Sequence, residues 1–287
     1  MKAQRSRGLS GGTGPVLPWL FLTVLLLPGL PLDAGAQTLD QLYRQAGSAM
    51  DQGRFQDAAA LYRQAAQLSP GDADPLVGLG FALTQLGQVE EAVVVLDRAL
   101  ALDPNSSDAH TNMGFAHWTL GNRDRAVMEY GIAARLNPAN VQALYNLGNS
   151  HMAMGSAAQA IAPLERVIQL QPNHVDALVT LGAARVFVGD PAGALPVLRQ
   201  AVSLAPDRSD AHFNLGLALG RAGDMAGAAG EHGWLEASGS ELARVLHNQL
   251  GDALIRAKRI REALPQAAPP LEAETDPSVS LLGVSAG

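Results

Sequence analysis

The residues best suited to chemistry in this sequence are its histidines, because an imidazole can bind metal ions and transfer protons near neutral pH. They are His110, His117, His151, His174, His212, His232 and His247. His117 and His151 lie 34 residues apart, but no HExxH zinc motif and no P-loop accompanies them. The chain has no cysteine, which excludes thiolate metal sites and cysteine nucleophiles. We therefore expect packed histidines, no enzyme activity, no catalytic residue, no metal and no cofactor.

The N-terminal segment has the pattern of an export signal. Lys2, Arg5 and Arg7 precede a short apolar run over 16–27, and a small-residue stretch follows that ends at Ala36. This order predicts a secretory signal peptide over 1–36, cleaved after Ala36, and an exported chain that is periplasmic or secreted. The alternative is a retained anchor, which alone would bring membrane contact. A spanning helix needs about 20 apolar residues, and this run is shorter and flanked by prolines.

A spacing of 34 residues runs through the rest of the sequence in four series. The series are Gly80, Gly114, Gly148, Gly182 and Gly216; Gly53, Gly87, Gly121, Gly155, Gly189 and Gly223; Ala58, Ala92, Ala126, Ala160, Ala194 and Ala228; and Pro70, Pro104, Pro138, Pro172 and Pro206. Four series in one register predict a repeat protein of six units, over residues 39–237.

Each series has a physical role if every unit folds as two helices. We number the units so that Gly80 is position 8 and Pro104 is position 32. The position-8 glycine and position-20 alanine then lie where the two helices cross, about 8–10 Å apart. The position-15 glycine ends the first helix, and the proline closes the unit. Asp103, Asn105 and Asp108 are expected to cap the following helix.

Apolar residues at helical spacing predict the buried face of each unit. In the third and fifth units these are Met113, Ala126, Tyr130, Ala133, Leu178, Leu181, Ala194, Leu198 and Ala201.

The repeat resembles the tetratricopeptide repeat. One unit reads Leu144-x2-Leu147-Gly148, then Ala160-x3-Leu164 and Pro172. The family pattern is W-x2-L-G-x2-Y, then A-x3-F, then P, so the unit keeps its Leu-Gly, Ala and Pro and has Leu144, His151 and Leu164 in place of the Trp, Tyr and Phe. The resemblance implies an all-α, right-handed α-solenoid of about six helix–turn–helix units. Remnants of a seventh unit predict a C-terminal capping helix or a degenerate seventh unit over 238–264, and prolines in 265–287 predict a disordered tail.

The resemblance also implies that first-helix residues at positions 2, 5, 9, 12 and 13 line a concave groove. The candidate binding residues are Tyr43, Val77, Phe81, Thr84, Thr111, Phe115, Trp118, Tyr145, Asn149, Met152, Val179, Phe187 and Phe213. Seven of the aromatic residues after the signal segment fall at groove positions, which favours a contact surface. The alternative is that these aromatic residues only pack within the repeat.

The groove lacks the basic residues with which family members grip a C-terminal carboxylate. Positions 5 and 9 hold no Lys or Arg, although Asn112, Asn146 and Asn214 occupy position 6. We therefore predict an apolar peptide or helix as the ligand. Aspartates at position 2 form either an acidic rim or helix N-caps. Those residues are Asp40, Asp74, Asp108, Asp176 and Asp210.

The net charge of −7 argues against a nucleic-acid partner, which needs a basic surface. The leading interpretation is an exported scaffold or adaptor that binds one or more proteins or peptides. The alternatives are a non-catalytic accessory subunit of an envelope enzyme or of a secretion or assembly complex, and a self-associating regulator.

Overall fold

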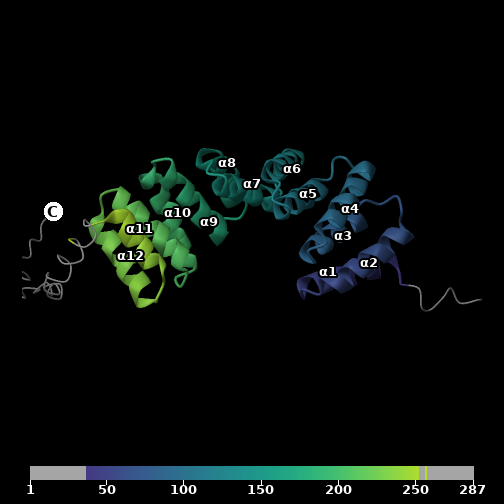
Figure 1. Cartoon of the computed structure of the whole chain (residues 1–287), viewed down its shortest axis with the longest axis horizontal. Helices are drawn as coiled ribbons and strands as arrows, with labels where there is room; N and C mark the ends of the chain where they lie inside the picture. Colours follow the sequence, from purple (N-terminus) through teal and green to yellow (C-terminus); the bar gives the residue numbers. More distant parts are fainter. Residues whose placement is uncertain (1–36, 252–255, 257–287) are drawn as a thin grey trace, which may run out of the picture. The chain divides into compact units, whose positions relative to one another are not determined.

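The computed structural model describes residues 37–251 and residue 256. Thirteen α-helices and no strand occur among these described residues (Figure 1). The helices are α1 (Leu39–Asp51), α2 (Phe55–Leu68), α3 (Asp74–Gln85), α4 (Val89–Leu102), α5 (Ser107–Thr119), α6 (Arg123–Leu136), α7 (Val141–Ala153), α8 (Ala157–Leu170), α9 (Val175–Phe187), α10 (Pro191–Leu204), α11 (Ser209–Arg221), α12 (Met225–Ala237) and α13 (Leu242–Leu250).

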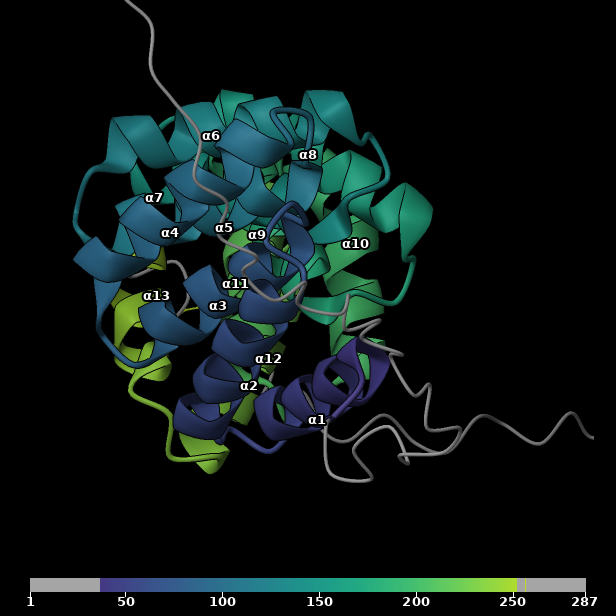
Figure 2. The same cartoon turned by 90° about the vertical axis from the view of Figure 1, so that its right-hand side faces the viewer.

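Consecutive helices form the two-helix units that the 34-residue spacing predicts. In each unit the first helix packs against the second, and the second packs against the first helix of the next unit. From α3 to α13, the first helices of neighbouring units also contact one another. In Figure 2 the second helices α6, α8 and α10 lie toward the rim, while α5, α9 and α11 lie nearer the middle. The predicted all-α repeat solenoid is confirmed.

The turn inside each unit is set by a glycine in the left-handed conformation. The φ angle is +75° at Gly87, and it lies between +68° and +92° at all six position-15 glycines. The Gly87 N–H donates to the Thr84 carbonyl at 3.0 Å, and the Gln88 N–H donates to the Leu83 carbonyl at 2.9 Å. This pair of hydrogen bonds is a common way to end a helix, and its positive φ favours glycine.

The position-8 glycines allow the two helices of a unit to approach closely. A Cβ atom added to Gly148 would lie 2.6 Å from Leu164 Cγ and 3.3 Å from the backbone oxygen of Ala160. A Cβ atom on Gly114 would lie 2.7 Å from the Tyr130 ring. Both carbon–carbon distances are far below the optimal separation of about 3.5–4.0 Å. The predicted role of position 8 follows from these distances.

The helix caps differ from the sequence-based prediction. At the start of α5, the Ser106 hydroxyl accepts a hydrogen bond from the Ala109 N–H at 3.2 Å. Asp103 instead accepts from the Asn105 N–H at 3.0 Å inside the loop, and Asp108 lies in the first helical turn. The capping prediction was wrong, because a capping residue needs an extended backbone, and here the extended residue is Ser106 at position 34, directly before the helix. The position-2 aspartates lie in the first turn, where a negative charge favours the helix dipole.

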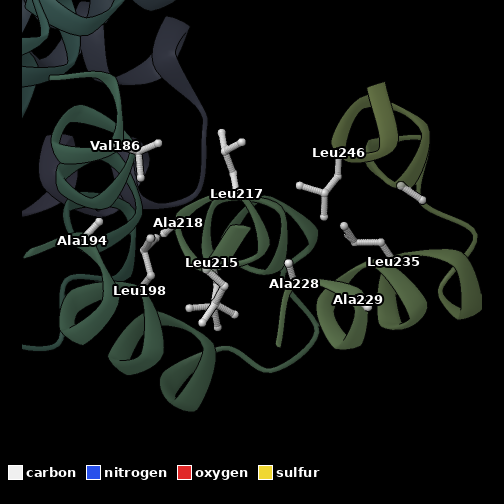
Figure 3. Close-up of a cluster of buried hydrophobic side chains, with 12 residues drawn as sticks. Val186, Ala194, Leu198, Leu215, Leu217, Ala218, Ala228, Ala229, Leu235 and Leu246 are labelled. Atoms are coloured by element: carbon white, nitrogen blue, oxygen red, sulfur yellow. The ribbon is translucent and has the colours of Figure 1, made fainter. Parts of the chain in front are cut away.

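The core is a row of small apolar clusters along the stack. Every residue predicted to face inward in the third and fifth units is buried. The C-terminal cluster, shown in Figure 3, includes Leu235 of α12 and Leu246 of α13, both fully buried. Leu246 lies over Gly216 of α11, where an added Cβ atom would meet its Cδ2 at 2.7 Å. Helix α13 therefore covers the last repeat from the position that a further first helix would occupy.

Several predictions fall on residues outside the described part of the chain. They are the signal peptide over 1–36, the tail over 265–287, and most of the predicted capping segment beyond Leu250. Within residues 37–251, no helix has the length and hydropathy needed to span a membrane.

Candidate protein-binding groove

The first helices form a continuous layer, which we call the A-helix face. It consists of the residues of α1, α3, α5, α7, α9 and α11 that point away from the second helices. Because each of α3, α5, α7 and α9 contacts the next first helix, side chains from three neighbouring units lie close together on this face. Such a surface suits an extended or helical segment of another protein better than a small molecule.

A hollow of about 390 Å³ lies on the A-helix face between α3, α5 and α7. Its centre is a pair of half-buried rings, Phe81 and Phe115, whose centroids are 5.8 Å apart with 36° between the planes. We call this hollow the phenylalanine groove. Its lining residues are Phe81, Gln85, Thr111, Asn112, Phe115, Gln142 and Asn146. Its volume lies within the usual range for ligand sites, about 300–1,000 Å³.

Primary amides surround the two rings. The Asn112 Nδ2 donates to the Val77 carbonyl at 3.2 Å, and the Gln142 Nε2 donates to Asn146 Oδ1 at 3.0 Å. Among the described residues no hydrogen bond involves Asn112 Oδ1, Asn146 Nδ2 or the exposed Gln85 amide. The groove therefore combines an apolar floor with free donors and acceptors, which match the N–H and C=O groups of a peptide backbone.

The predicted site residues fall into groups, and Thr111 belongs to two of them. Phe81, Thr111 and Phe115 line the phenylalanine groove. Val77, Thr84, Thr111 and Val179 are buried, and the Thr84 and Thr111 hydroxyls donate to backbone carbonyls one helical turn earlier. Because they expose so little surface, these four side chains mainly support the helices of the A-helix face.

Other predicted aromatic residues make their own contacts outside the phenylalanine groove. The Tyr43 hydroxyl donates to Asp72 Oδ2 at 3.1 Å, and burial and the Asp72 charge raise the pKa of Tyr43. Arg123 Cζ lies 5.5 Å from the centre of the Trp118 ring, a cation–π contact. Tyr145 lies beside His174, with 5.1 Å between ring centroids.

The remaining predicted residues are spread along the face. Phe213 packs against the C-terminal core cluster, whereas Phe187 is 72% exposed. Asn149 is exposed and Met152 is half-buried against the core of the fourth unit. The structure thus brings together only part of the predicted set, around Phe81 and Phe115.

The list of candidate binding residues from the sequence left out four amides of the groove, although two of them, Gln142 and Gln85, occupy positions 2 and 13, which were expected to face it. Gln85, Asn112, Gln142 and Asn146 line the groove. The signal was present, because Asn112 and Asn146 are 34 residues apart at position 6. Position 6 lies one residue from position 5, and the predicted groove positions left it out.

A second hollow of about 470 Å³ lies over α2 and α4, on the side of the second helices. Val94, 68% exposed, lines it, and the Arg63–Glu91 ion pair of 2.8 Å is at its edge. It has no aromatic residue in its lining. The phenylalanine groove is the better candidate, since aromatic residues supply much of the binding energy at protein interfaces.

Two histidines at position 4, His110 in the third unit and the buried His212 in the sixth, make the same pair of polar contacts. His212 Nδ1 lies 2.6 Å from Glu231 Oε2, and its Nε2 lies 3.0 Å from the Pro206 carbonyl oxygen. The ring also stacks on Trp234 at 3.6 Å between centroids. His110 repeats the two polar contacts, with Glu129 Oε2 at 2.7 Å from its Nδ1 and the Pro104 carbonyl oxygen at 3.2 Å from its Nε2. These histidines are packed structural residues, as predicted.

We expect the Glu231→Ala substitution to lower the free energy of unfolding by about 1–3 kcal/mol, because it leaves a buried imidazole without its charged partner. The His212 side chain is 7% exposed and the Glu231 side chain 21%. Asp40→Ala is the control, since it breaks an ion pair with Arg44 that is about 70% exposed on both sides. Such pairs contribute about 0–1 kcal/mol. Urea unfolding followed by circular dichroism measures both, and equal losses would contradict the structural role of the buried pair.

No group of three or more His, Asp or Glu side chains within residues 37–251 is placed to hold a metal ion. His117 is buried and the hydrogen bonds of the described residues leave its Nδ1 without a partner, while burial lowers the pKa of His151. Both are position-11 residues of a first helix.

A stack of two-helix units with a continuous layer of first helices defines a helical-repeat scaffold for binding other proteins. The chain belongs to the tetratricopeptide repeat (TPR) family. Models described as Tetratricopeptide repeat match residues 49–114, 111–175 and 179–240. The resemblance inferred from the sequence is confirmed. Membership of this family supports the interpretation of the chain as a protein–protein interaction scaffold. The repeat fold of the family is typically non-catalytic.

Solved TPR structures have the same fold. PilF of Pseudomonas aeruginosa superposes with a TM-score of 0.64 at 17% identity, covering 74% of this chain and 97% of PilF. PilW, a widely conserved type IV pilus biogenesis factor, gives 0.61 at 19% identity, covering 74% and 99%. YrrB, a TPR protein with an unusual peptide-binding site, gives 0.57 at 21%, covering 70% and 100%. No curated protein matches the chain in sequence.

Proposed function

We propose that the chain is an exported TPR scaffold that holds a segment of another protein in the phenylalanine groove. The observation that carries the proposal is the Phe81–Phe115 pair, which lies in a hollow lined by amides without full hydrogen bonding. Apolar side chains of the partner would cover the two rings. The Asn112 and Asn146 amides would bond its backbone.

The absence of basic residues from the helices of the groove argues against a partner that binds through its C-terminal carboxylate. Helices α3, α5 and α7 contain no Lys or Arg. A free C-terminal carboxylate of a partner would therefore meet no cation in the groove. The proposed ligand is an internal apolar segment, either extended or helical.

A second candidate is an accessory role in an envelope assembly complex. Its support is the similarity in fold to PilF and to PilW, the latter a type IV pilus biogenesis factor, together with the signal-like N-terminal segment. In this role the protein would bind its partner through the same groove. The second candidate therefore adds the complex in which the scaffold acts and does not replace the first. Self-association is the remaining alternative, and light scattering of the purified chain distinguishes it by molar mass.

Export is a prediction of its own. We expect the protein isolated from cells to begin at Gln37, because the basic start, apolar run and Ala34-Gly35-Ala36 exit are typical of a cleaved signal. Intact-mass spectrometry and N-terminal sequencing measure this directly. A product that keeps Lys2, Arg5 and Arg7 and sediments with membranes would show that the segment is an anchor.

The binding proposal is tested by photocrosslinking in intact cells. A photoreactive amino acid in place of Gln142, at the groove edge, is expected to give a discrete covalent adduct with another protein. The same amino acid in place of Val94, on the second-helix side, is the matched control. Adducts from residue 94 and none from residue 142 would contradict the proposal.

A further inference from the structure

Four aspartates lie at the N-terminal starts of α3 and α5, the helices that carry Phe81 and Phe115 of the phenylalanine groove. Asp74 and Asp108 occupy the first turns of α3 and α5, and Asp72 and Asp103 lie in the loops that lead into these helices. Asp108 is one helical turn before Asn112 of the groove, hence on the same side of α5.

These carboxylates act on one another. Burial raises the pKa of Asp74, and the negative charges of Asp72, Asp108 and Asp103 raise it further. Asp72 accepts hydrogen bonds from the Tyr43 hydroxyl and the Asp74 N–H, and Asp108 accepts from Asn140 Nδ2 at 3.1 Å. Among the described residues the exposed Asp74 carboxylate has neither an ion pair nor a hydrogen bond.

No basic side chain on the three helices of the groove offsets this charge. The positive N-terminal ends of α3 and of α5 offset part of it, about half an elementary charge each. Against four carboxylates, this leaves about three negative charges at the starts of these two helices. Lys and Arg are absent from α3, α5 and α7. On the second helices, Arg63 pairs with Glu91, and Arg123 lies over Trp118. Helix α4 also carries Arg98, and α6 carries Arg125 and Arg135; among the described residues, none of these three forms an ion pair with the four aspartates.

We propose that the groove selects a basic amphipathic segment, whose apolar side chains cover Phe81 and Phe115 and whose Lys or Arg residues lie against Asp74 and Asp108. The inference rests on the proposed function and adds the charge of the partner to it. An acidic segment would meet like charge at Asp74. A neutral segment would use the rings and leave the carboxylates without a counter-charge.

The test uses three synthetic amphipathic peptides of about four helical turns. Each has Leu on its apolar face, and the polar face consists of Lys in the first peptide, Glu in the second and Gln in the third. Their binding to the purified full-length product is measured by fluorescence anisotropy at about 0.05 and about 0.5 M NaCl. We expect the Leu/Lys peptide to bind most tightly and to lose affinity at high salt. The Asp74→Asn, Asp108→Asn double variant should bind the Leu/Lys peptide about fivefold more weakly at low salt, because exposed charge pairs contribute little energy each.

The control variant carries Glu90→Gln and Asp97→Asn, which remove the same charge from exposed positions on α4. An equal loss of affinity in this variant would show attraction to the net charge of the whole chain and would overturn the inference.

The Leu/Gln peptide distinguishes the proposed groove from the proposed charge preference. If it binds as tightly as the Leu/Lys peptide and requires Phe81 and Phe115, the groove stands and the charge preference is wrong. If no peptide depends on these rings, both proposals fail.

Discussion

The Phe81→Ala, Phe115→Ala double variant is expected to lose affinity for the Leu/Lys peptide by about 100-fold or more. The two rings form the apolar floor of the groove, with 5.8 Å between their centroids. Truncating a central aromatic residue of an interface costs about 2 kcal/mol or more of binding free energy. Two such losses together correspond to more than about a 100-fold loss of affinity. Fluorescence anisotropy measures the change directly.

The fold should survive this change, because neither ring belongs to the fully buried set of core side chains. An unchanged far-ultraviolet circular dichroism spectrum serves as the check. Val94→Ala is the matched control, since it removes an exposed apolar side chain from α4. Retention of full affinity in the double variant would exclude the phenylalanine groove as the binding site.

The Gly148→Leu variant is expected to show the largest loss of stability, more than about 3 kcal/mol, because overpacking a tight site costs about 1–3 kcal/mol or more. Its Cβ alone would lie 2.6 Å from Leu164 Cγ, and the backbone oxygen of Ala160 closes the other side. Since neighbouring units stabilise one another, the loss should extend to the adjacent repeats. Thermal unfolding by circular dichroism reports the total change.

Gly47→Ala and Gly148→Ala form a matched pair for this prediction. A Cβ at Gly47 of α1 has no heavy atom within 4 Å. Alanine there should stabilise the helix by about 0.5–1 kcal/mol, because glycine loses more entropy on folding. Alanine at 148 should destabilise the chain. If Gly148→Ala raises the melting temperature as Gly47→Ala does, glycine at position 8 has no role in helix crossing.

Most of the fold could be predicted because each unit repeats the same physical constraints. Gly87 and its equivalents fix the turns through positive φ, and Gly148 and its equivalents fix the crossings through contact distance. The caps could not be predicted as well. Ser106, Asp103 and Asp108 are all good capping residues, and only the backbone conformation distinguishes them.

The site could be predicted only in part, because residue position within a repeat does not determine exposure. Val77 and Phe81 are both groove positions, yet Val77 is buried in the contact between units while Phe81 lies open beside Phe115. Whether a side chain on a first helix is free depends on how the next unit packs over it. The same packing brings Gln142 from the fourth unit to the edge of the groove.

The central claim, that the A-helix face of the second to fourth units holds the partner, is tested most directly by hydrogen–deuterium exchange of the full-length product with and without saturating Leu/Lys peptide. We predict slower exchange in α3, α5 and α7, with little change in α4, α6 and α8. Slower exchange confined to α2 and α4, around Val94, would contradict the account and would place the binding surface on the second helices.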